Sequence, residues 1–254
     1  MKIIKKIIKK LLSFFNYQLV NKKFVTHNSL PVEANDFEKE IITKLKVYSM
    51  TGETRMFALI KAFEYIFKNN IEGDFVECGV WRGGNLILLQ KLIEKYNSKN
   101  IIYGYDTFEG MTEPNTEDID FNKNTAKKLM DAEKNVENEN SIWCISKIEE
   151  VEKNIKENTN NNNIRLIQGD VKKTLKIKSN LPEKISILRL DTDFYDSTKI
   201  ELEILFPLLS KGGVLIIDDY GHWLGAKKAV DEYFKNDKPW FHVVDYSCRL
   251  AIKI

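Results

Sequence analysis

Short apolar runs rich in β-branched residues alternate along this chain with longer segments whose apolar residues recur every three or four positions. The first pattern predicts buried strands and the second predicts amphipathic helices. The predicted strands cover residues 74–77, 101–105, 164–167, 185–190 and 214–217. The predicted helices cover residues 37–48, 51–67, 85–96, 142–157, 198–209 and 226–234. This alternation predicts an α/β fold, with a mostly parallel twisted sheet and helices on both faces.

The carboxyl-terminal part of the pattern adds detail to this sheet. Residues 241–244 and 249–252 predict a closing antiparallel strand pair. Thr198, with Glu201 three residues later, matches a capping box and predicts the start of a helix. Gly212-Gly213 then predicts the end of that helix.

One long stretch does not fit the alternation. Residues 112–141 are polar and charged, with few apolar positions, and they come after the second predicted strand. A loop of this length is typical of a lid or a binding loop. We therefore expect one domain over residues 37–254, with a lid over the ligand crevice, preceded by an irregular connector over residues 16–36.

Residues 1–15 form a separate basic segment. Its apolar pairs recur at helical spacing, and its lysines, Lys2, Lys5, Lys6, Lys9 and Lys10, take the opposite face. Such a helix suits an anionic membrane interface, where each lysine contributes about 1 kcal/mol. The alternative is a helix packed on its own domain or on a second subunit of a homo-oligomer. We expect a cytoplasmic protein, peripheral on the inner membrane face if the first interpretation holds.

Charge and cysteine content exclude several classes. The formal net charge is +2, so no overall nucleic-acid-binding signature exists. Cys78, Cys144 and Cys248 have no zinc-site spacing and make no paired framework, which favours a reducing compartment. We found no secretory signal and no apolar stretch long enough to span a bilayer.

A glycine-rich segment, residues 77–84, comes after the first predicted strand and opens a helix. Glycines there let backbone amides approach a ligand, and the helix start favours a carboxylate or phosphate. The spacing is not GxGxxG, so a dinucleotide is disfavoured. Glu77 at the strand end can bind an ammonium group such as an amino-acid-bearing cofactor presents. The alternative is a tight structural turn.

The ends of the next two strands extend this candidate site. Asp106 ends the second strand, where a carboxylate can accept hydrogen bonds from ribose hydroxyls. Phe108 is then placed to lie against an adenine, and Gly169-Asp170 after the third strand to border it. The alternative for Asp106 taken alone is a helix or turn cap, and the glycine-rich segment beside it favours the ligand-binding role.

Carboxylates close the fourth and fifth strands. Asp191, Asp218 and Asp219 would repel one another at one crevice unless protonated or bound to a cation. An all-oxygen set suits Mg²⁺ better than zinc, and a neighbouring carboxylate can accept a proton. The alternative is a set of helix caps and turns. His222 and Trp223 come soon after and are candidates for substrate contact.

At these residues the chain resembles the macrocin O-methyltransferase family. The resemblance covers about residues 45–254 and runs through five blocks: YSMTGETRMFALIKAFEYI, DFVECGVWRGGN, YGYDTFEGMTEP, LRLDTDFYDST and LLSKGGVLIIDDYGHWLGAKKAVDEYF. It implies a Rossmann-like class I methyltransferase fold, S-adenosylmethionine as methyl donor and Mg²⁺ in the site.

The resemblance also implies roles for individual residues. Asp191, Asp218 and Asp219 would be the metal ligands, with Asp191 also the general base. The cofactor would be lined by Met50, Thr51, Glu77, Gly79, Trp81, Gly83, Gly84, Asn85, Asp106, Thr107, Phe108, Gly169 and Asp170. The third-strand motif departs from the family, which usually carries an aromatic residue after the glycine.

The expected function is O-methylation of a sugar hydroxyl on a glycan, glycolipid or glycosylated natural product. A catechol-like diol is an alternative acceptor, because it requires the same metal chemistry. A non-catalytic nucleotide-binding protein that retains the fold is a second alternative. A nicotinamide oxidoreductase is disfavoured by the glycine spacing.

Overall fold

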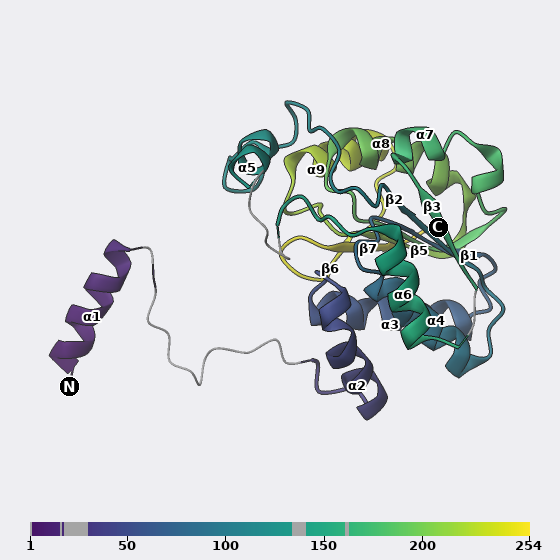
Figure 1. Cartoon of the computed structure of the whole chain (residues 1–254), viewed down its shortest axis with the longest axis horizontal. Coiled ribbons are helices and arrows are strands. Elements are labelled where there is room, and N and C mark those ends of the chain that lie inside the picture. The colour runs from purple at the N-terminus through teal and green to yellow at the C-terminus, as the bar shows by residue number, and fades with distance from the viewer. Residues whose placement is uncertain (1, 16, 18–29, 134–140, 161–162) are drawn as a thin grey trace.

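The computed structural model describes residues 2–15, 17, 30–133, 141–160 and 163–254. The connector expected over residues 16–36 lies mostly outside this described part, as does the end of the expected lid. Helix α1 (Lys2–Phe14) is drawn apart from the rest of the described chain (Figure 1). Among the described residues, no helix combines the length and the apolar character needed to cross a membrane.

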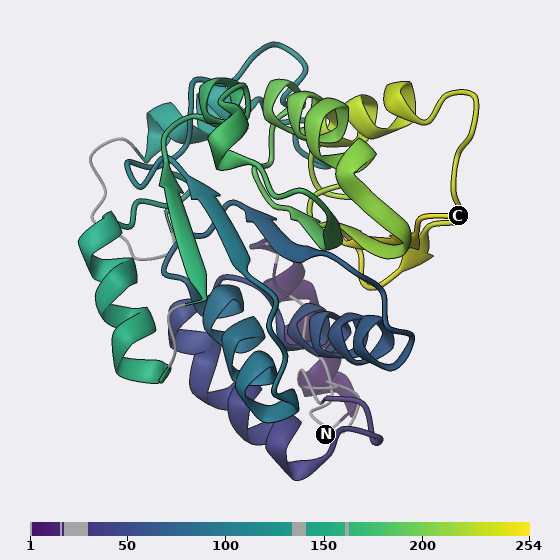
Figure 2. The same cartoon turned by 90° about the vertical axis from the view of Figure 1, so that its right-hand side faces the viewer.

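A seven-stranded sheet forms the centre of the molecule (Figure 2). Its strands are β1 (Asp74–Cys78), β2 (Ile102–Asp106), β3 (Ile164–Gln168), β4 (Ile185–Leu190), β5 (Leu209–Ile217), β6 (His242–Val243) and β7 (Arg249–Ile252). The order is β3-β2-β1-β4-β5-β7-β6. The pairs among β1 to β5 are parallel, while β7 runs antiparallel to both β5 and β6. The predicted mostly parallel sheet with a closing antiparallel pair is confirmed.

Helices cover both faces of this sheet (Figures 1 and 2). One face carries α2 (Asp36–Leu45), α3 (Glu53–Lys68), α4 (Gly84–Tyr96) and α6 (Ile148–Asn158), with the short helix η1 (Lys46–Tyr48). The other carries α7 (Val171–Thr174), α8 (Tyr195–Leu205) and α9 (Leu224–Tyr233). The chain also forms α5 (Ala126–Ala132), η2 (Lys178–Asn180) and η3 (Phe206–Leu208).

Strand residues alternate between two hydrophobic clusters, because successive side chains of a strand point to opposite faces. Phe75 packs with α3 and α4 residues, whereas its neighbour Val76 packs with the cluster under α8 and α9. In the parallel register Cys78 pairs with both Tyr105 and Leu190. The carboxyl ends of these strands therefore share one edge, where ligands bind in open α/β sheets.

Two boundary predictions around α8 are wrong. The helix begins at Tyr195, so Thr198 lies within it and Glu201 is no capping residue. Instead Glu201 is fully buried and accepts a hydrogen bond from Thr192 Oγ1 at 2.8 Å. Gly212 does not end the helix but lies in β5, because its N–H donates to the Lys253 carbonyl at 2.7 Å in the antiparallel ladder.

The predicted helix over residues 142–157 starts later, at Ile148. Residues 142–147 instead continue the irregular segment that crosses the carboxyl edge of the sheet. This segment also contains α5, which the polar composition did not predict. Met130 of α5 is buried, so part of the expected lid is folded onto the domain.

Candidate functional site

A cavity of about 490 Å³ opens at the carboxyl edge of the parallel strands. Its volume is in the range of small-molecule and cofactor sites. Most residues predicted for a site line it: Met50, Thr51, Gly79, Trp81, Asn85, Asp106, Thr107, Gly169, Asp170, Asp191, Asp218, Asp219, His222 and Trp223.

Four predicted site residues do not line the cavity. Glu77 is buried behind it, where its Oε1 accepts a hydrogen bond from Asn85. Phe108, predicted to contact adenine, is buried in the hydrophobic core instead. Gly83 and Gly84 form the turn into α4. These residues support the cavity from behind.

Gly79 allows the chain to pass close to the β4 end. Its φ of +90° disfavours a side chain, and a Cβ would lie 1.9 Å from the Asp191 carbonyl oxygen. The turn after β1 and the residue after β4 are thereby brought into contact.

Asp106 organises the glycine-rich turn. Its Oδ2 accepts the N–H groups of Val80 at 2.7 Å and Trp81 at 3.0 Å, and its Oδ1 accepts that of Phe108 at 2.8 Å. The turn-cap role considered from sequence is therefore present. The predicted ribose contact remains compatible through Oδ1, because an oxygen with two lone pairs that accepts one N–H can accept a second donor.

Several buried polar atoms in the cavity lining or directly behind it have no hydrogen-bond partner among the described residues. They include the acceptors Glu77 Oε2 and Asn85 Oδ1 and the donor Trp81 Nε1. Buried polar atoms are normally satisfied, so such a group indicates a missing ligand or water. Two acceptors suit an ammonium group, and an indole N–H suits an oxygen or nitrogen acceptor. These atoms fit an amino-acid-bearing cofactor.

Arg189 connects the two ends of the site. Its Nη1 donates to Glu77 Oε1 at 2.6 Å and to Asp191 Oδ2 at 2.7 Å. Its Nη2 donates to Thr51 Oγ1 at 3.0 Å and to Asp218 Oδ1 at 2.5 Å. Burial alone would lower the pKa of Arg189, but Asp191, Asp218 and Glu77 raise it, so the guanidinium stays charged.

A second arginine holds the outer side of Asp218. Arg55 Nη1 donates to Asp218 Oδ2, and Arg55 Nε donates to Asp245 Oδ2 at 2.7 Å. Both oxygens of Asp218 are thus bonded to arginines. The sequence prediction of Asp218 as a metal ligand requires one of these bonds to be exchanged.

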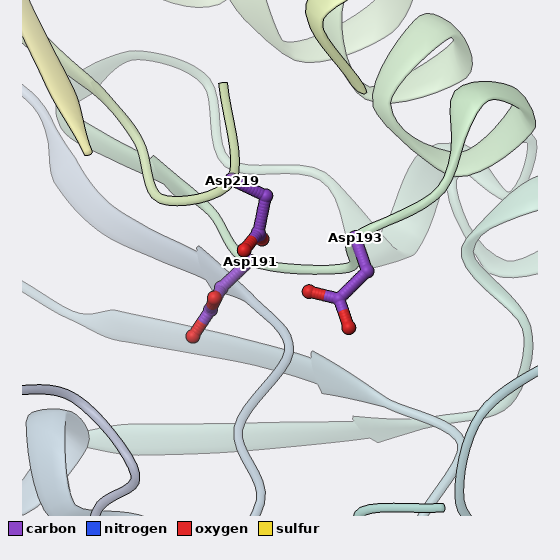
Figure 3. A group of neighbouring side chains, drawn as sticks. All are labelled: Asp191, Asp193 and Asp219. Carbon is purple, nitrogen blue, oxygen red and sulfur yellow. The ribbon is translucent and has the colours of Figure 1, made fainter. Parts of the chain in front are cut away.

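Asp191, Asp193 and Asp219 converge at the other side of the cavity (Figure 3). One oxygen from each lies within 4.8 Å of the others. The buried Oδ2 of Asp219 has no hydrogen-bond partner among the described residues. The structure therefore groups two of the predicted ligands with Asp193, and Asp218 lies behind them with the arginines.

The electrostatics of this group favour a cation. Burial raises the pKa of Asp191 and of Asp219 well above the ordinary value, and repulsion from the other carboxylates adds to it. The pKa of Asp193 is raised to about 7, mainly by burial. A hard divalent ion would relieve this repulsion, since oxygen ligands are the ones it prefers. The residues present fit Mg²⁺.

The irregular segment after β2 supplies an apolar wall to the cavity. Met111, Leu129, Ile142 and Cys144 line the cavity there. Trp143 Nε1 donates to the Met130 carbonyl at 3.0 Å, which ties the two ends of this wall together. A partly apolar acceptor suits this side of the cavity.

His222 stands at the mouth of the cavity. Its Nδ1 lies 3.0 Å from the hydroxyl of Tyr246, and its ring lies 5.1 Å from that of Phe121. Burial lowers the pKa of His222, so the imidazole is neutral at pH 7. This position agrees with the predicted substrate contact.

Sequence reasoning missed Arg55 and Arg189. Arg189 had a visible signal, because it is the one charged residue in β4, Ile185–Leu190, all of which is buried. A buried arginine requires carboxylate partners. Arg55 lies in α3, and no local pattern distinguishes it from a surface arginine.

Comparison with known proteins agrees with this geometry. The model of the macrocin O-methyltransferase family (TylF) matches residues 6–246. The demethyldecarbamoylnovobiocin O-methyltransferase of Streptomyces niveus is 30% identical over 188 residues, 73% of this chain and 67% of that protein. The 8-demethyl-8-(2,3-dimethoxy-alpha-L-rhamnosyl)-tetracenomycin-C 4'-O-methyltransferase of Streptomyces olivaceus is 31% identical over 176 residues, 68% of this chain and 62% of that protein.

Among solved structures, that of the O-methyltransferase NovP is similar with a TM-score of 0.70 and 28% sequence identity. The similarity covers 81% of this chain and 82% of that one. On the extent of the family match, the chain belongs to the macrocin O-methyltransferase family and is an O-methyltransferase.

Proposed function

We propose that this protein transfers the methyl group of S-adenosylmethionine to a sugar hydroxyl with the help of Mg²⁺. The observation that carries the proposal is that two kinds of unsatisfied group meet in one cavity. Asn85, whose Oδ1 has no partner among the described residues, lines the cavity in front of Glu77, whose Oε2 has none either, and the group of Asp191, Asp193 and Asp219 lines the same cavity.

At the cofactor end, Glu77 and Asn85 would receive the ammonium group of the methionine moiety. Asp106, which already fixes the glycine-rich turn, would accept hydrogen bonds from the ribose hydroxyls. Met50 and Thr51 border the same cavity and would close over the cofactor. These residues orient the methyl donor toward the carboxylates, which is the main requirement for a methyl transfer.

At the other end, Asp191 and Asp219 would hold the cation. Asp193 fills the third place in the described geometry, and Asp218 takes it if an arginine bond is exchanged. When bound, Mg²⁺ would lower the pKa of the acceptor hydroxyl. Asp191 is the proton acceptor predicted from sequence.

The acceptor assignment draws on the relatives and on the cavity wall. The Streptomyces olivaceus relative, which is 31% identical to this chain, is named as a 4'-O-methyltransferase of a rhamnosyl-tetracenomycin. In this chain, His222 and Trp223 border the cavity, and the apolar residues Met111 and Leu129 line it and pack in the same hydrophobic cluster as Trp223. We therefore assign a sugar attached to an apolar partner, such as a glycolipid or a glycosylated natural product.

Helix α1 would bring the enzyme to an anionic membrane surface that carries such a glycolipid. Its described side chains are all exposed or half-exposed, including Leu11 and Phe14, which are 63% and 84% exposed. Lys5, Lys6 and Lys9 supply positive charge on the same helix. An exposed apolar stripe beside lysines suits an interface of anionic lipid.

The assay is methyl transfer from S-adenosylmethionine to methyl α-L-rhamnoside, dTDP-rhamnose and 3,4-dihydroxybenzoate, followed by product mass. We expect methylated sugar with Mg²⁺ and none after EDTA treatment or with Asp219→Asn. Methylation of the catechol alone would replace the sugar assignment. Cation-independent transfer would remove the metal from the proposal.

A further inference from the structure

Residues 115–126, here called the strap, contact the first residues of α8 and α9. Asp118 is the centre of the strap and is 1% exposed. Its Oδ2 accepts the N–H of Asn115 at 2.7 Å, and its carbonyl accepts the N–H of Ala126 at 2.8 Å. The strap is thus closed on itself around one buried carboxylate.

The strap contacts the loop that comes after β4. Asp118 Oδ1 accepts the N–H of Tyr195, the first residue of α8, at 2.8 Å. The residue before α8, Phe194, has no side-chain capping bond, so Asp118 supplies the cap from a distant segment. Tyr195 lies two residues after Asp193, and the bond therefore fixes the end of the loop that carries Asp191 and Asp193.

The strap also contacts the loop that comes after β5. Asp120 forms an antiparallel bridge with Trp223, and the N–H of Leu224 donates to the Ile119 carbonyl at 2.8 Å. Trp223 lies four residues after Asp219. Its ring meets that of Phe194 edge to face at 5.6 Å, so the two loops are packed together beneath the strap.

Gly225 in α9 leaves the space that the Asp118 carboxylate occupies. A Cβ at Gly225 would lie 2.2 Å from Asp118 Oδ1, so the carboxylate reaches the start of α8 only because α9 has no side chain there. Three segments far apart in sequence therefore meet at one carboxylate.

We infer that Asp118 is a positioning residue for the cation site. By joining the ends of the loops that carry Asp193 and Asp219, it sets the separation of the carboxylates that hold the ion. The inference rests on the proposed cation site. Groups that orient metal ligands from behind typically change metal affinity about 10- to 100-fold when they are removed.

The test is Mn²⁺ binding to the full-length protein, measured by the electron paramagnetic resonance signal of the free ion. S-adenosylhomocysteine binding by calorimetry serves as the folding control. We expect Asp118→Ala and Gly225→Ala to weaken Mn²⁺ binding at least about tenfold. Asp118→Asn, which keeps an oxygen acceptor, should recover part of the loss. Cofactor affinity should change at most about twofold, since its contacts are separate.

Asp196→Ala is the matched control, because it removes an exposed carboxylate from the first turn of α8. It should leave Mn²⁺ affinity unchanged. If Asp118→Ala misfolds and loses cofactor binding, the Mn²⁺ affinities of Asp118→Asn and Gly225→Ala are compared with that of the wild type instead. Wild-type Mn²⁺ affinity in these variants contradicts the inference alone. Absence of Mn²⁺ binding in the wild type contradicts the cation site itself, whereas retained cofactor binding would leave the methyl-donor site standing.

Discussion

Arg189 Nη2 donates to Asp218 Oδ1 at 2.5 Å beneath the cavity, and both side chains are almost completely buried. The adjacent carboxylates Asp218 and Asp219 therefore have different roles. Asp218 neutralises the buried Arg189 and the half-buried Arg55, while Asp219 faces the cavity with an oxygen that has no partner among the described residues. Removing one member of a buried ion pair leaves the other charge uncompensated, which costs about 3–5 kcal/mol.

Asp218→Asn should therefore mainly change the stability of the fold, whereas Asp219→Asn should mainly change Mg²⁺ binding. We expect Asp218→Asn to lower the free energy of unfolding by about 3 kcal/mol, because Arg189 and Arg55 lose their shared partner. Asp219→Asn should cost less than about 1 kcal/mol, since it relieves repulsion, but should weaken Mg²⁺ binding at least about tenfold. Urea unfolding and calorimetry measure the two effects.

The exposed Asp237 provides the control for this pair, and Asp237→Asn should change neither quantity. An Asp218→Asn protein as stable as the wild type would contradict the structural role of the buried pair. Unchanged Mg²⁺ affinity in Asp219→Asn would contradict its role as ligand.

Glu77→Gln should separate the two halves of the cofactor. The variant loses the negative charge that we assign to the ammonium group, so S-adenosylhomocysteine should bind about 10- to 100-fold more weakly, the worth of a charged hydrogen bond. 5′-Methylthioadenosine lacks the amino-acid portion and should bind Glu77→Gln and wild type equally. Calorimetry with both ligands tests this, and an equal loss for both would show that the variant perturbs the whole cavity.

The sequence predicted the strands and the cavity edge well, because both depend on local pattern. The all-buried run Ile185–Leu190 can only be an interior strand, and the residues directly after such a strand must lie at the ligand edge. The start of α8 was missed because its first N–H is satisfied by Asp118, which is 77 residues away from Tyr195. Such long-range partners, like those of Arg55, have no local signature.

Glu201 gives a pH-dependent prediction. Burial first, and repulsion from Asp191 and Asp219, raise its pKa to about 8 from an ordinary 4.5. The folded state therefore favours the neutral acid, and stability falls as pH rises from 4.5 to about 8. Glu201→Gln removes this loss, so it should raise the free energy of unfolding by about 4 kcal/mol at pH 8 and little at pH 4.5, given 1.36 kcal/mol per pKa unit.

Urea unfolding in EDTA at both pH values measures this difference. Glu203→Gln, on the exposed side of the same helix, is the control and should show no pH-dependent gain. If Glu201→Gln destabilises the protein equally at both pH values, Glu201 is ionised in the folded state and the assignment of its charge is wrong.

Deletion of residues 1–15 tests the membrane proposal. We expect the full chain to sediment with vesicles containing phosphatidylglycerol, to bind phosphatidylcholine vesicles weakly, and to be released by salt, because lysine–lipid attraction is screened. The deletion should abolish binding. A variant with Lys5, Lys6, Lys9 and Lys10 changed to Gln keeps the apolar residues and should bind poorly.

Unchanged vesicle binding after the deletion would contradict this role of α1. If the deletion instead halves the molar mass in solution, the helix is a contact between subunits, as the second interpretation of its pattern expects. Light scattering coupled to size exclusion distinguishes the two results.

The central claim is that the cavity binds S-adenosylmethionine beside a divalent cation. It is tested most directly by calorimetric titration of S-adenosylhomocysteine into EDTA-treated protein, repeated with Mg²⁺ and with NADH as the comparison ligand. We predict one micromolar cofactor site per chain, a separate Mg²⁺ heat that Asp219→Asn removes, and no NADH binding. Absence of S-adenosylhomocysteine binding in every condition would contradict the account.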